Sequence, residues 1–169
     1  MDEIVLHQHH GKEKIPAVQI KEYEPKYQPD FFELNKQWIE KDFPLEEIDI
    51  AVLSDPAKYI LNDGGAILLA KLGDAVVGTC ALKRISDDVF ELTKMAVNEN
   101  YRGQKIGEKL GKAILAKAKQ MNAKKVELYS NRFTSAIAVK LYQKLGFVEV
   151  PLTPGVYTRA NIKMEILLD

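Results

Sequence analysis

The amino-acid sequence lacks an excess of charge of either sign. Its 169 residues include 24 lysine and arginine side chains and 24 aspartate and glutamate side chains, so the formal net charge is zero. A general nucleic-acid-binding protein is expected to carry a basic excess or a basic stripe. Hydrophobic residues make up 46% and charged residues 28% of the chain, which is typical of a soluble globular protein. We therefore expect no nucleic-acid partner.

The sequence also has little cysteine and no long apolar run. A single cysteine, Cys80, excludes an internal disulfide framework and is typical of a reducing compartment, so we expect a cytoplasmic protein. Cys80 lies in a strand-like run and is expected to be a small core residue, not a nucleophile. No apolar run approaches the length of a membrane span. The first residues place acids before a very short apolar run, unlike a signal peptide. We therefore expect no membrane partner.

Repeats, linkers and low-complexity segments are lacking too, and the length is that of one domain. We expect residues 1–169 to form a single domain, with residues 1–14 as a flexible or peripheral N-terminal segment. This segment contains His7, His9 and His10. A metal site would need fixed geometry and usually further ligands. A solvated, mobile terminus is the preferred interpretation, and we expect no bound metal.

What is present is a succession of strand and helix patterns. Short runs rich in apolar and β-branched residues predict strands at residues 17–23, 66–72, 75–83, 90–97, 125–129, 147–150 and 161–168. Amphipathic spacing predicts helices at residues 29–43, 46–53, 56–61, 106–122 and 136–145, the first of them capped by Asp30. Gly73 and Asp74 form a hairpin turn. The order indicates an α/β protein, a mixed sheet with helices on both faces.

An acidic region follows the first predicted helix. It contains Asp42, Glu46, Glu47 and Asp49. The preferred interpretation is a solvated helix surface. The functional alternative is an acidic rim that attracts a cationic amine.

The segment from residue 90 to residue 111, FELTKMAVNENYRGQKIGEKLG, is typical of a strand, a polar turn and the start of a helix. Alternation places four side chains on one face of the strand: Glu91, Thr93, Met95 and Val97. The turn from Arg102 to Gly107 collects free backbone N–H groups and the positive end of a helix dipole. Its small residues let a phosphate approach the backbone closely. The residues alone leave two alternatives about equal, a phosphate-bearing cofactor or an ordinary tight turn.

Two motifs in this region resemble those of a known family. ELTKMAV followed by YRGQKIGEKL is similar to the acetyl-CoA-binding motif of the GNAT family of N-acetyltransferases. Arg102 and Gly107 match the ends of that motif, while Lys105 stands where the family usually has its middle glycine. The Lys105 side chain either narrows the pyrophosphate site or supplies a second cation. A second family motif is matched by AIAVKLYQKLGF at residues 136–147.

The resemblance implies a GNAT-like fold, with a mostly antiparallel central sheet of about seven strands, and acetyl-CoA as cosubstrate. It implies that the backbone of residues 95–97 pairs with the pantetheine arm like an added strand, and that the amide of Ala96 or Val97 polarises the thioester carbonyl. Ser135 stands where the family often has an asparagine that contacts this arm. The implied cofactor-binding residues are Met95, Ala96, Val97, Arg102, Gly103, Gln104, Lys105, Ile106, Gly107, Asn131 and Ser135.

The same resemblance points to two catalytic residues. Glu91 lies where some members have a glutamate base, and burial would raise its pKa toward a useful range. The alternative is a carboxylate paired with a basic neighbour such as Lys94. Tyr142 lies in the family's LY-x-K-x-GF pattern, whose tyrosine commonly protonates the sulfur of coenzyme A. The alternative for Tyr142 is a core tyrosine whose hydroxyl is satisfied.

Taken together, these expectations predict an acetyl-CoA-dependent N-acetyltransferase. Its reaction would be the direct attack of a primary amine on acetyl-CoA in a ternary complex. The acceptor is a small molecule or a peptide amine, with a small molecule favoured, and its contacts are expected from residues 31–61 and 151–160. A homodimer is compatible with the resemblance. The alternative function is a non-catalytic sensor or regulatory module that binds coenzyme A, which Lys105 and Ser135 favour.

Overall fold

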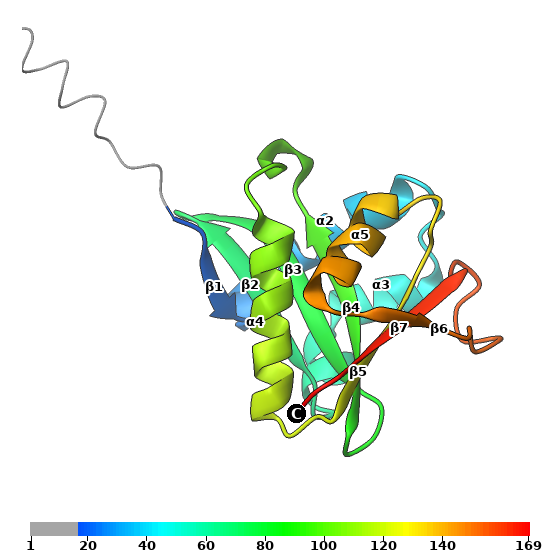
Figure 1. Cartoon of the computed structure of the whole chain (residues 1–169). Coiled ribbons are helices and arrows are strands. Elements are labelled where there is room, and N and C mark those ends of the chain that lie inside the picture. The colour runs from blue at the N-terminus through cyan, green and yellow to red at the C-terminus, as the bar shows by residue number, and fades with distance from the viewer. Residues whose placement is uncertain (1–16) are drawn as a thin grey trace, which may run out of the picture.

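Figure 1 shows the computed structural model of the chain, in which residues 17–169 are described. The strands are β1 (Gln19–Glu22), β2 (Ala66–Leu72), β3 (Ala75–Arg84), β4 (Val89–Val97), β5 (Lys125–Ser130), β6 (Val148–Val150) and β7 (Ile162–Leu167). The helices are α2 (Gln28–Glu40), α3 (Glu47–Ser54), α4 (Ile106–Gln120) and α5 (Ala136–Leu145), and short helical turns are η1 (Pro25–Tyr27), η2 (Ala57–Leu61) and η3 (Glu99–Tyr101). The predicted N-terminal segment 1–14, with its histidine cluster, lies outside the described residues. Within residues 17–169, no helix is both long enough and apolar enough to cross a membrane.

The strands form one seven-stranded sheet in the order β1-β2-β3-β4-β5-β7-β6. Every neighbouring pair is antiparallel except β4 and β5, which run parallel. The predicted mixed, mostly antiparallel sheet is therefore confirmed. The hairpin of β2 and β3 turns at Gly73, whose φ of 62° lies in the left-handed region that glycine adopts without strain.

Helices cover both faces of the sheet, as predicted (Figure 1). Alternate residues of β2 belong to different hydrophobic cores, because successive side chains of a strand point to opposite faces. Leu68 and Ala70 belong to the core that α4 and α5 complete, and Ile67 and Leu69 to the core that α2, α3 and η2 complete. Cys80 is fully buried in the first of these cores, so its predicted core placement is confirmed.

The N-terminal helices differ from prediction in their caps. The residue preceding α2 is Tyr27, with no side-chain cap, and Asp30 lies in the first turn of the helix, so the predicted Asp30 cap is wrong. The turn η1 leads directly into α2, and this continuous path leaves no separate capping position for Asp30. By contrast, α3 begins with a capping box in which the Glu46 and Asp49 side chains accept each other's backbone N–H. The predicted short helix at 56–61 is the π-helical turn η2.

The central strand β4 contains a bulge that changes which side chains share a face. Between the pairs Thr79–Ala96 and Ala81–Thr93, β4 has one more residue than β3, and Lys94 has a φ of 55°. One extra residue reverses the alternation beyond it. Met95 therefore packs against the same core as Phe90, the neighbour from which the Glu91 side chain alternates. The prediction that Glu91, Thr93, Met95 and Val97 share one face is wrong, because Lys94 breaks the period.

Candidate active site

The site lies where β4 and β5 part. Their parallel pairing joins Val89–Glu91 to Lys125–Glu127 and stops there, although both strands continue. The residues that follow on each strand line two adjoining cavities. A pair of strands without hydrogen bonds between them leaves backbone groups free to bind a ligand. The bulge has the same effect, since Lys94 and Met95 have no partner residue on β3.

The larger cavity, which we call the outer groove, has a volume of about 780 Å³. It runs along the start of α4, past the turn after β4, and against α5. Eight of the predicted cofactor-binding residues line it: Met95, Val97, Arg102, Gly103, Lys105, Ile106, Gly107 and Ser135. Gln104 is exposed beside the groove without lining it, and Ala96 is buried in β4. The structure therefore brings eight of the eleven predicted residues together along one groove, and their contact with a cofactor stays a prediction.

The turn before α4 presents free backbone donors to the outer groove. Gly103 has a φ of 82°, and Lys105, the residue preceding α4, has a φ of 59°. A non-glycine residue rarely adopts this conformation, and it is found chiefly where surrounding structure or function imposes it. The Lys105 side chain makes no capping hydrogen bond to α4 among the described residues. The first N–H groups of the helix are therefore available to an anion.

Two cations in the outer groove have no acidic partner among residues 17–169. Neither Lys105 nor Lys140 forms an ion pair with another described residue, whereas Lys144 lies 3.0 Å from Glu108. Both unpaired lysines are exposed. They add positive potential to the helix terminus.

The smaller cavity, which we call the inner cavity, has a volume of about 170 Å³ and continues from the outer groove. Met95, Ser135 and Ala138 line both. The polar side chains that line the inner cavity include the acids Asp42 and Glu91, the cations Lys94 and Arg159, and the neutral residues Asn35, Tyr129, Asn131, Tyr142 and Tyr157. Among residues 17–169, no group of three or more histidine, cysteine or acidic side chains is arranged to hold a metal ion.

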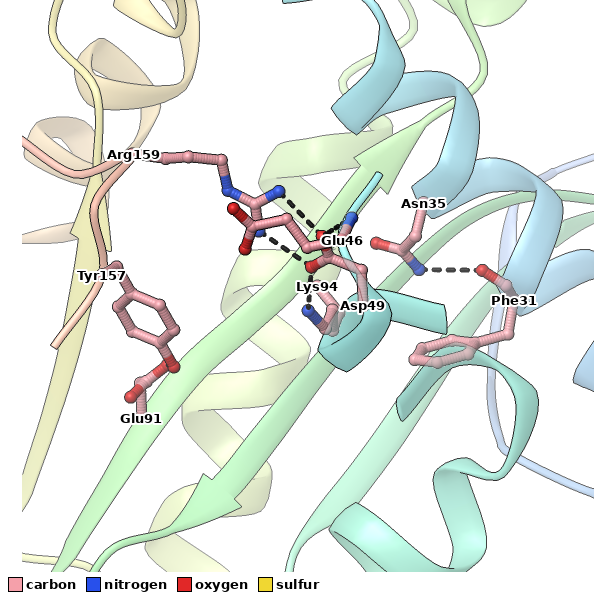
Figure 2. Close-up of polar contacts among 8 residues, drawn as sticks. All are labelled: Phe31, Asn35, Glu46, Asp49, Glu91, Lys94, Tyr157 and Arg159. Carbon is pink, nitrogen blue, oxygen red and sulfur yellow. Dashed lines mark hydrogen bonds and ion pairs between the residues drawn. The ribbon is translucent and has the colours of Figure 1, made fainter. Parts of the chain in front are cut away.

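Glu91 is buried in β4, with 4% of its surface exposed. The Tyr157 hydroxyl donates a hydrogen bond to Glu91 Oε2 over 2.7 Å, and Figure 2 shows the two side chains facing each other. Burial raises the pKa of Glu91 and the nearby Glu127 adds to this, while the Tyr157 hydrogen bond, Lys83 and Lys94 oppose it. The predicted direction of the pKa shift is therefore confirmed. The alternative of a pairing with Lys94 is wrong, because Lys94 points to Asp49.

Tyr142 occupies the side of the inner cavity opposite β4, on helix α5. Its ring is 6% exposed and packs edge-to-face against Phe147, with centroids 5.9 Å apart. Burial raises the pKa of Tyr142, with a smaller contribution from Cys80, so the phenol is neutral at physiological pH and holds its proton. Tyr142 is thus both a core residue and a wall of the cavity.

Asn131 and Ser135 lie where β5 passes into α5. Asn131 Oδ1 accepts from the backbone N–H groups of Phe133 and Thr134, at 2.9 and 3.1 Å, and Asn131 Nδ2 donates to the backbone carbonyl of Arg159 over 3.0 Å. Asn131 therefore joins the loop after β5 to the loop before β7. Its expected contact with a pantetheine arm, like that of Ser135, stays a prediction.

Asp49 holds a buried charge cluster with Lys94 and Arg159, two cations that line the inner cavity (Figure 2). Its two carboxylate oxygens accept from Arg159 Nη1 and Nη2 at 3.0 and 2.8 Å, and Lys94 Nζ lies 4.0 Å away. Burial acts to raise the pKa of Asp49, but the hydrogen bonds from Arg159 and Glu46 and the charges of Arg159 and Lys94 outweigh it, so the pKa is lowered. The preferred interpretation of a solvated acidic surface is wrong for Asp49, which is 2% exposed.

Two residues of the site, Tyr157 and Arg159, were not singled out by the sequence. They lie on the loop between β6 and β7, which was expected to contact the acceptor. Their partners lie 66 and 110 residues earlier in the chain. No local pattern marks such a pairing. The available signal was that Tyr157 is the one aromatic residue and Arg159 the one charged residue of the sequence from 151 to 161.

Comparison with known proteins places this geometry in context. The acetyltransferase (GNAT) family pattern matches residues 20–147. An acetyltransferase of the GNAT family from Staphylococcus aureus Mu50 superposes with a TM-score of 0.80 at 25% identity, over 90% of this chain and 100% of that one. The PaiA N-acetyltransferase from Thermoplasma acidophilum, solved in complex with coenzyme A, superposes with a TM-score of 0.70 at 19% identity, over 90% of this chain and 99% of that one. The N-acetylaspartate synthetase of Xenopus tropicalis is 34% identical over 110 residues, which are 61% of this chain and 40% of that protein.

Proposed function

Because this chain belongs to the acetyltransferase (GNAT) family, we propose that it moves the acetyl group of acetyl-CoA to the primary amine of a small molecule, by direct attack in a ternary complex. The observation that supports this most is the junction of the two cavities. The outer groove can accept the phosphates and pantetheine arm at the start of α4, and the inner cavity can accept an amine. The thioester would then lie at the junction, beside Met95, Ser135 and Ala138.

We assign the proton transfers to the two buried groups that flank this junction. The Glu91 carboxylate takes a proton from the acceptor ammonium, directly or through water, because a free amine with a pKa of about 10.4 is mostly protonated at neutral pH. The amine lone pair attacks the thioester carbon, and a backbone N–H of Ala96 or Val97 stabilises the oxyanion. The nitrogen of the tetrahedral intermediate still carries a second proton, which passes to water as the carbon–sulfur bond breaks, and the Glu91 carboxyl returns its own proton to solvent. The departing thiolate of coenzyme A takes the proton of the Tyr142 hydroxyl. Solvent restores that proton.

Two observations favour a small acceptor. The inner cavity, at about 170 Å³, has room for a small molecule or one extended side chain and not for a folded surface. In addition, a relative at 34% identity is named for a product of an amino acid, N-acetylaspartate. That relative is longer than this chain, so its name supports the size and polarity of the acceptor and not its identity.

The test is a panel of amines incubated with purified protein and acetyl-CoA, measured by release of free thiol and by the mass of the product. Glu91→Gln and Tyr142→Phe should each lower kcat about 10²–10⁴-fold with little change in the affinity for coenzyme A, because each removes a group needed only in the transition state. High pH should partly restore Glu91→Gln, since hydroxide then deprotonates the amine.

The control is Gly107→Glu, which should abolish binding of coenzyme A in calorimetry. A Cβ atom at Gly107 already meets Leu141 Cδ2 at 3.0 Å, and the added carboxylate repels the diphosphate. Wild-type protein that binds coenzyme A but acetylates no amine would instead support the regulatory module. Full turnover in both catalytic variants would contradict the assigned roles.

A further inference from the structure

The inner cavity contains an ammonium group that the rest of the protein does not fully engage. Lys94 extends from the bulge of β4, and 17% of its side chain is exposed. Its Nζ lies 4.0 Å from Asp49 Oδ1, which is an ion pair but too long for a hydrogen bond. Lys94 also lines the inner cavity. Within residues 17–169, then, its three donors have a charged neighbour but no hydrogen-bond acceptor.

Asp49 has little capacity left for Lys94. Its Oδ1 accepts from Arg159 Nη2 at 2.8 Å, and its Oδ2 accepts from Arg159 Nη1 at 3.0 Å and from the Glu46 backbone at 2.9 Å. One buried carboxylate therefore faces two cations. Asp42 also lines the inner cavity and the charge of Glu46 acts on Arg159, but both acids are exposed, so water screens their charge.

The opposite side of the cavity is arranged differently. There the Glu91 carboxylate is bound by the Tyr157 hydroxyl, at 2.7 Å. The cavity thus has a proton acceptor on one side and unbalanced positive charge on the other. An acceptor with one amine and one carboxylate fits both sides, whereas a diamine would place a second ammonium beside Lys94 and Arg159.

On the basis of the proposed function, we propose that the acceptor is an amino acid whose carboxylate binds Lys94 while its amine faces Glu91. Lys94 is then a specificity-determining residue. Arg159 also lines the inner cavity, and its Nε could serve as a second donor, because the two hydrogen bonds from Arg159 to Asp49 use its Nη atoms. A carboxylate here would receive charge-assisted hydrogen bonds in a setting with little water, where they are strong.

The experiment compares matched acceptors that differ in one carboxylate. Aspartate, glutamate and alanine are assayed beside asparagine, alaninamide, propylamine and putrescine, with acetyl-CoA saturating. The wild type should give the higher kcat/KM for amino acids, and alaninamide should be about 10–100-fold poorer than alanine, the size of a lost hydrogen bond to a charged group. Binding of the same compounds to the protein loaded with coenzyme A is measured by calorimetry, so that affinity is read apart from turnover.

Variants of Lys94 test the residue itself. Lys94→Gln should lower kcat/KM for alanine about 10–100-fold and leave alaninamide within a few-fold, so the preference for a carboxylate disappears. Lys94→Arg keeps the charge and should retain part of the preference. Lys36→Gln is the matched control, because Lys36 lies on α2 in an exposed pair with Glu40 and does not line the cavity. Thermal unfolding and coenzyme A affinity confirm that each variant is folded.

The outcomes separate this inference from the proposed function. Acetylation of propylamine and alaninamide as efficient as that of the amino acids would overturn the amino-acid acceptor and leave the acetyltransferase intact. The same preference for carboxylates in wild type and Lys94→Gln would overturn the role of Lys94. Binding of none of the amino acids to the loaded protein would overturn the inference, whereas failure to acetylate any amine despite such binding would overturn the proposed function alone.

Discussion

A single hydroxyl contacts the carboxylate to which we assign base catalysis. Tyr157 reaches Glu91 from a loop, and its ring packs edge-to-face on Tyr129, with centroids 5.2 Å apart. The hydrogen bond stabilises the ionised carboxylate and so lowers its pKa, against the larger effect of burial, which raises it. The net direction is upward, which suits a general base because it brings the pKa closer to the working pH.

Tyr157→Phe should therefore raise the pKa of Glu91 further. Because the base acts only when ionised, the acid limb of the pH profile of kcat/KM should move to higher pH, with activity lost first at the acidic end. The measurement is that profile with a confirmed acceptor. Tyr129→Phe is the matched control, since it removes a neighbouring hydroxyl that does not bind Glu91, and its profile should stay in place. If the acid limb of the Tyr157→Phe profile is unchanged or moves to lower pH, Tyr157 does not lower the pKa of Glu91 as we expect.

Local sequence could not reveal these residue-scale contacts. The hairpin turn at Gly73 and the helix that contains Tyr142 depend on residues that are neighbours in the sequence, and both elements were predicted correctly. The left-handed conformation of Lys94 could not be predicted in this way, because lysine has no preference for it. It accompanies the shift in register between β3 and β4. The pairing of Asp49 with Arg159 likewise depends on how the whole chain folds.

At the scale of elements, the position of α5 against α4 depends on a close approach at Gly111. A Cβ atom added there would meet Leu145 Cδ1 at 2.4 Å, closer than any real contact. The ion pair of Glu108 with Lys144 spans the same two helices. Since α5 carries Tyr142 and one wall of the outer groove, this contact sets the width of the site.

Gly111→Val should destabilise the protein by about 1–3 kcal/mol, because it overfills the contact between the helices. It should also raise KM for acetyl-CoA by moving α5 outward. Thermal unfolding and steady-state kinetics measure the two effects. The double variant with Leu145→Ala should recover most of the stability relative to Leu145→Ala alone, because the shortened side chain makes room. Lys109→Val, an exposed position on the same helix, controls for the lower helix propensity of valine, and an equal loss there would refute the steric explanation.

The element order and the faces covered were predictable because apolar periodicity is a local property. The length of the parallel pairing between β4 and β5, and the length of the unpaired part of these strands beyond it, could not be predicted. The parallel pairing of β4 ends at Glu91, yet the strand itself continues to Val97 with the same β-forming composition. β5 meanwhile stays paired with β7 as far as Ser130, so its separation from β4 depends on pairings between elements far apart in the chain, which the residues of β4 do not encode.

At the scale of the whole molecule, the zero net charge means that attraction of an anionic cosubstrate must come from a local field. The outer groove supplies one, since Lys105 and Lys140 have no ion-pair partner among the described residues and the free end of α4 points the same way. Other cations of the groove are paired, such as Lys41 with Glu99. Removal of one unpaired cation should therefore be visible in the salt dependence of binding.

Lys105→Ala should weaken coenzyme A binding and reduce the slope of affinity against salt concentration, because one contributing charge is lost. Calorimetry at several salt concentrations measures both. Lys105→Gly separates charge from backbone strain, since glycine adopts the φ of 59° freely, and it should show the same reduced slope. Lys58→Ala, an exposed lysine on η2 outside the groove, should change neither quantity. Tighter binding in Lys105→Ala would mean that the side chain obstructs the site.

The two cavities draw on partly different parts of the gene. The outer groove is built mostly from residues 95–108 and 133–144, with Trp38, Lys41 and Asp42 at its edge, whereas only the inner cavity uses Asn35, Ile39 and Phe43 and residues 157–160. Donor chemistry and acceptor choice can thus be inherited separately. After a gene duplication, one copy could acquire a new acceptor through changes in these outlying segments while the acetyl donor, and the core that holds it, stayed as they were.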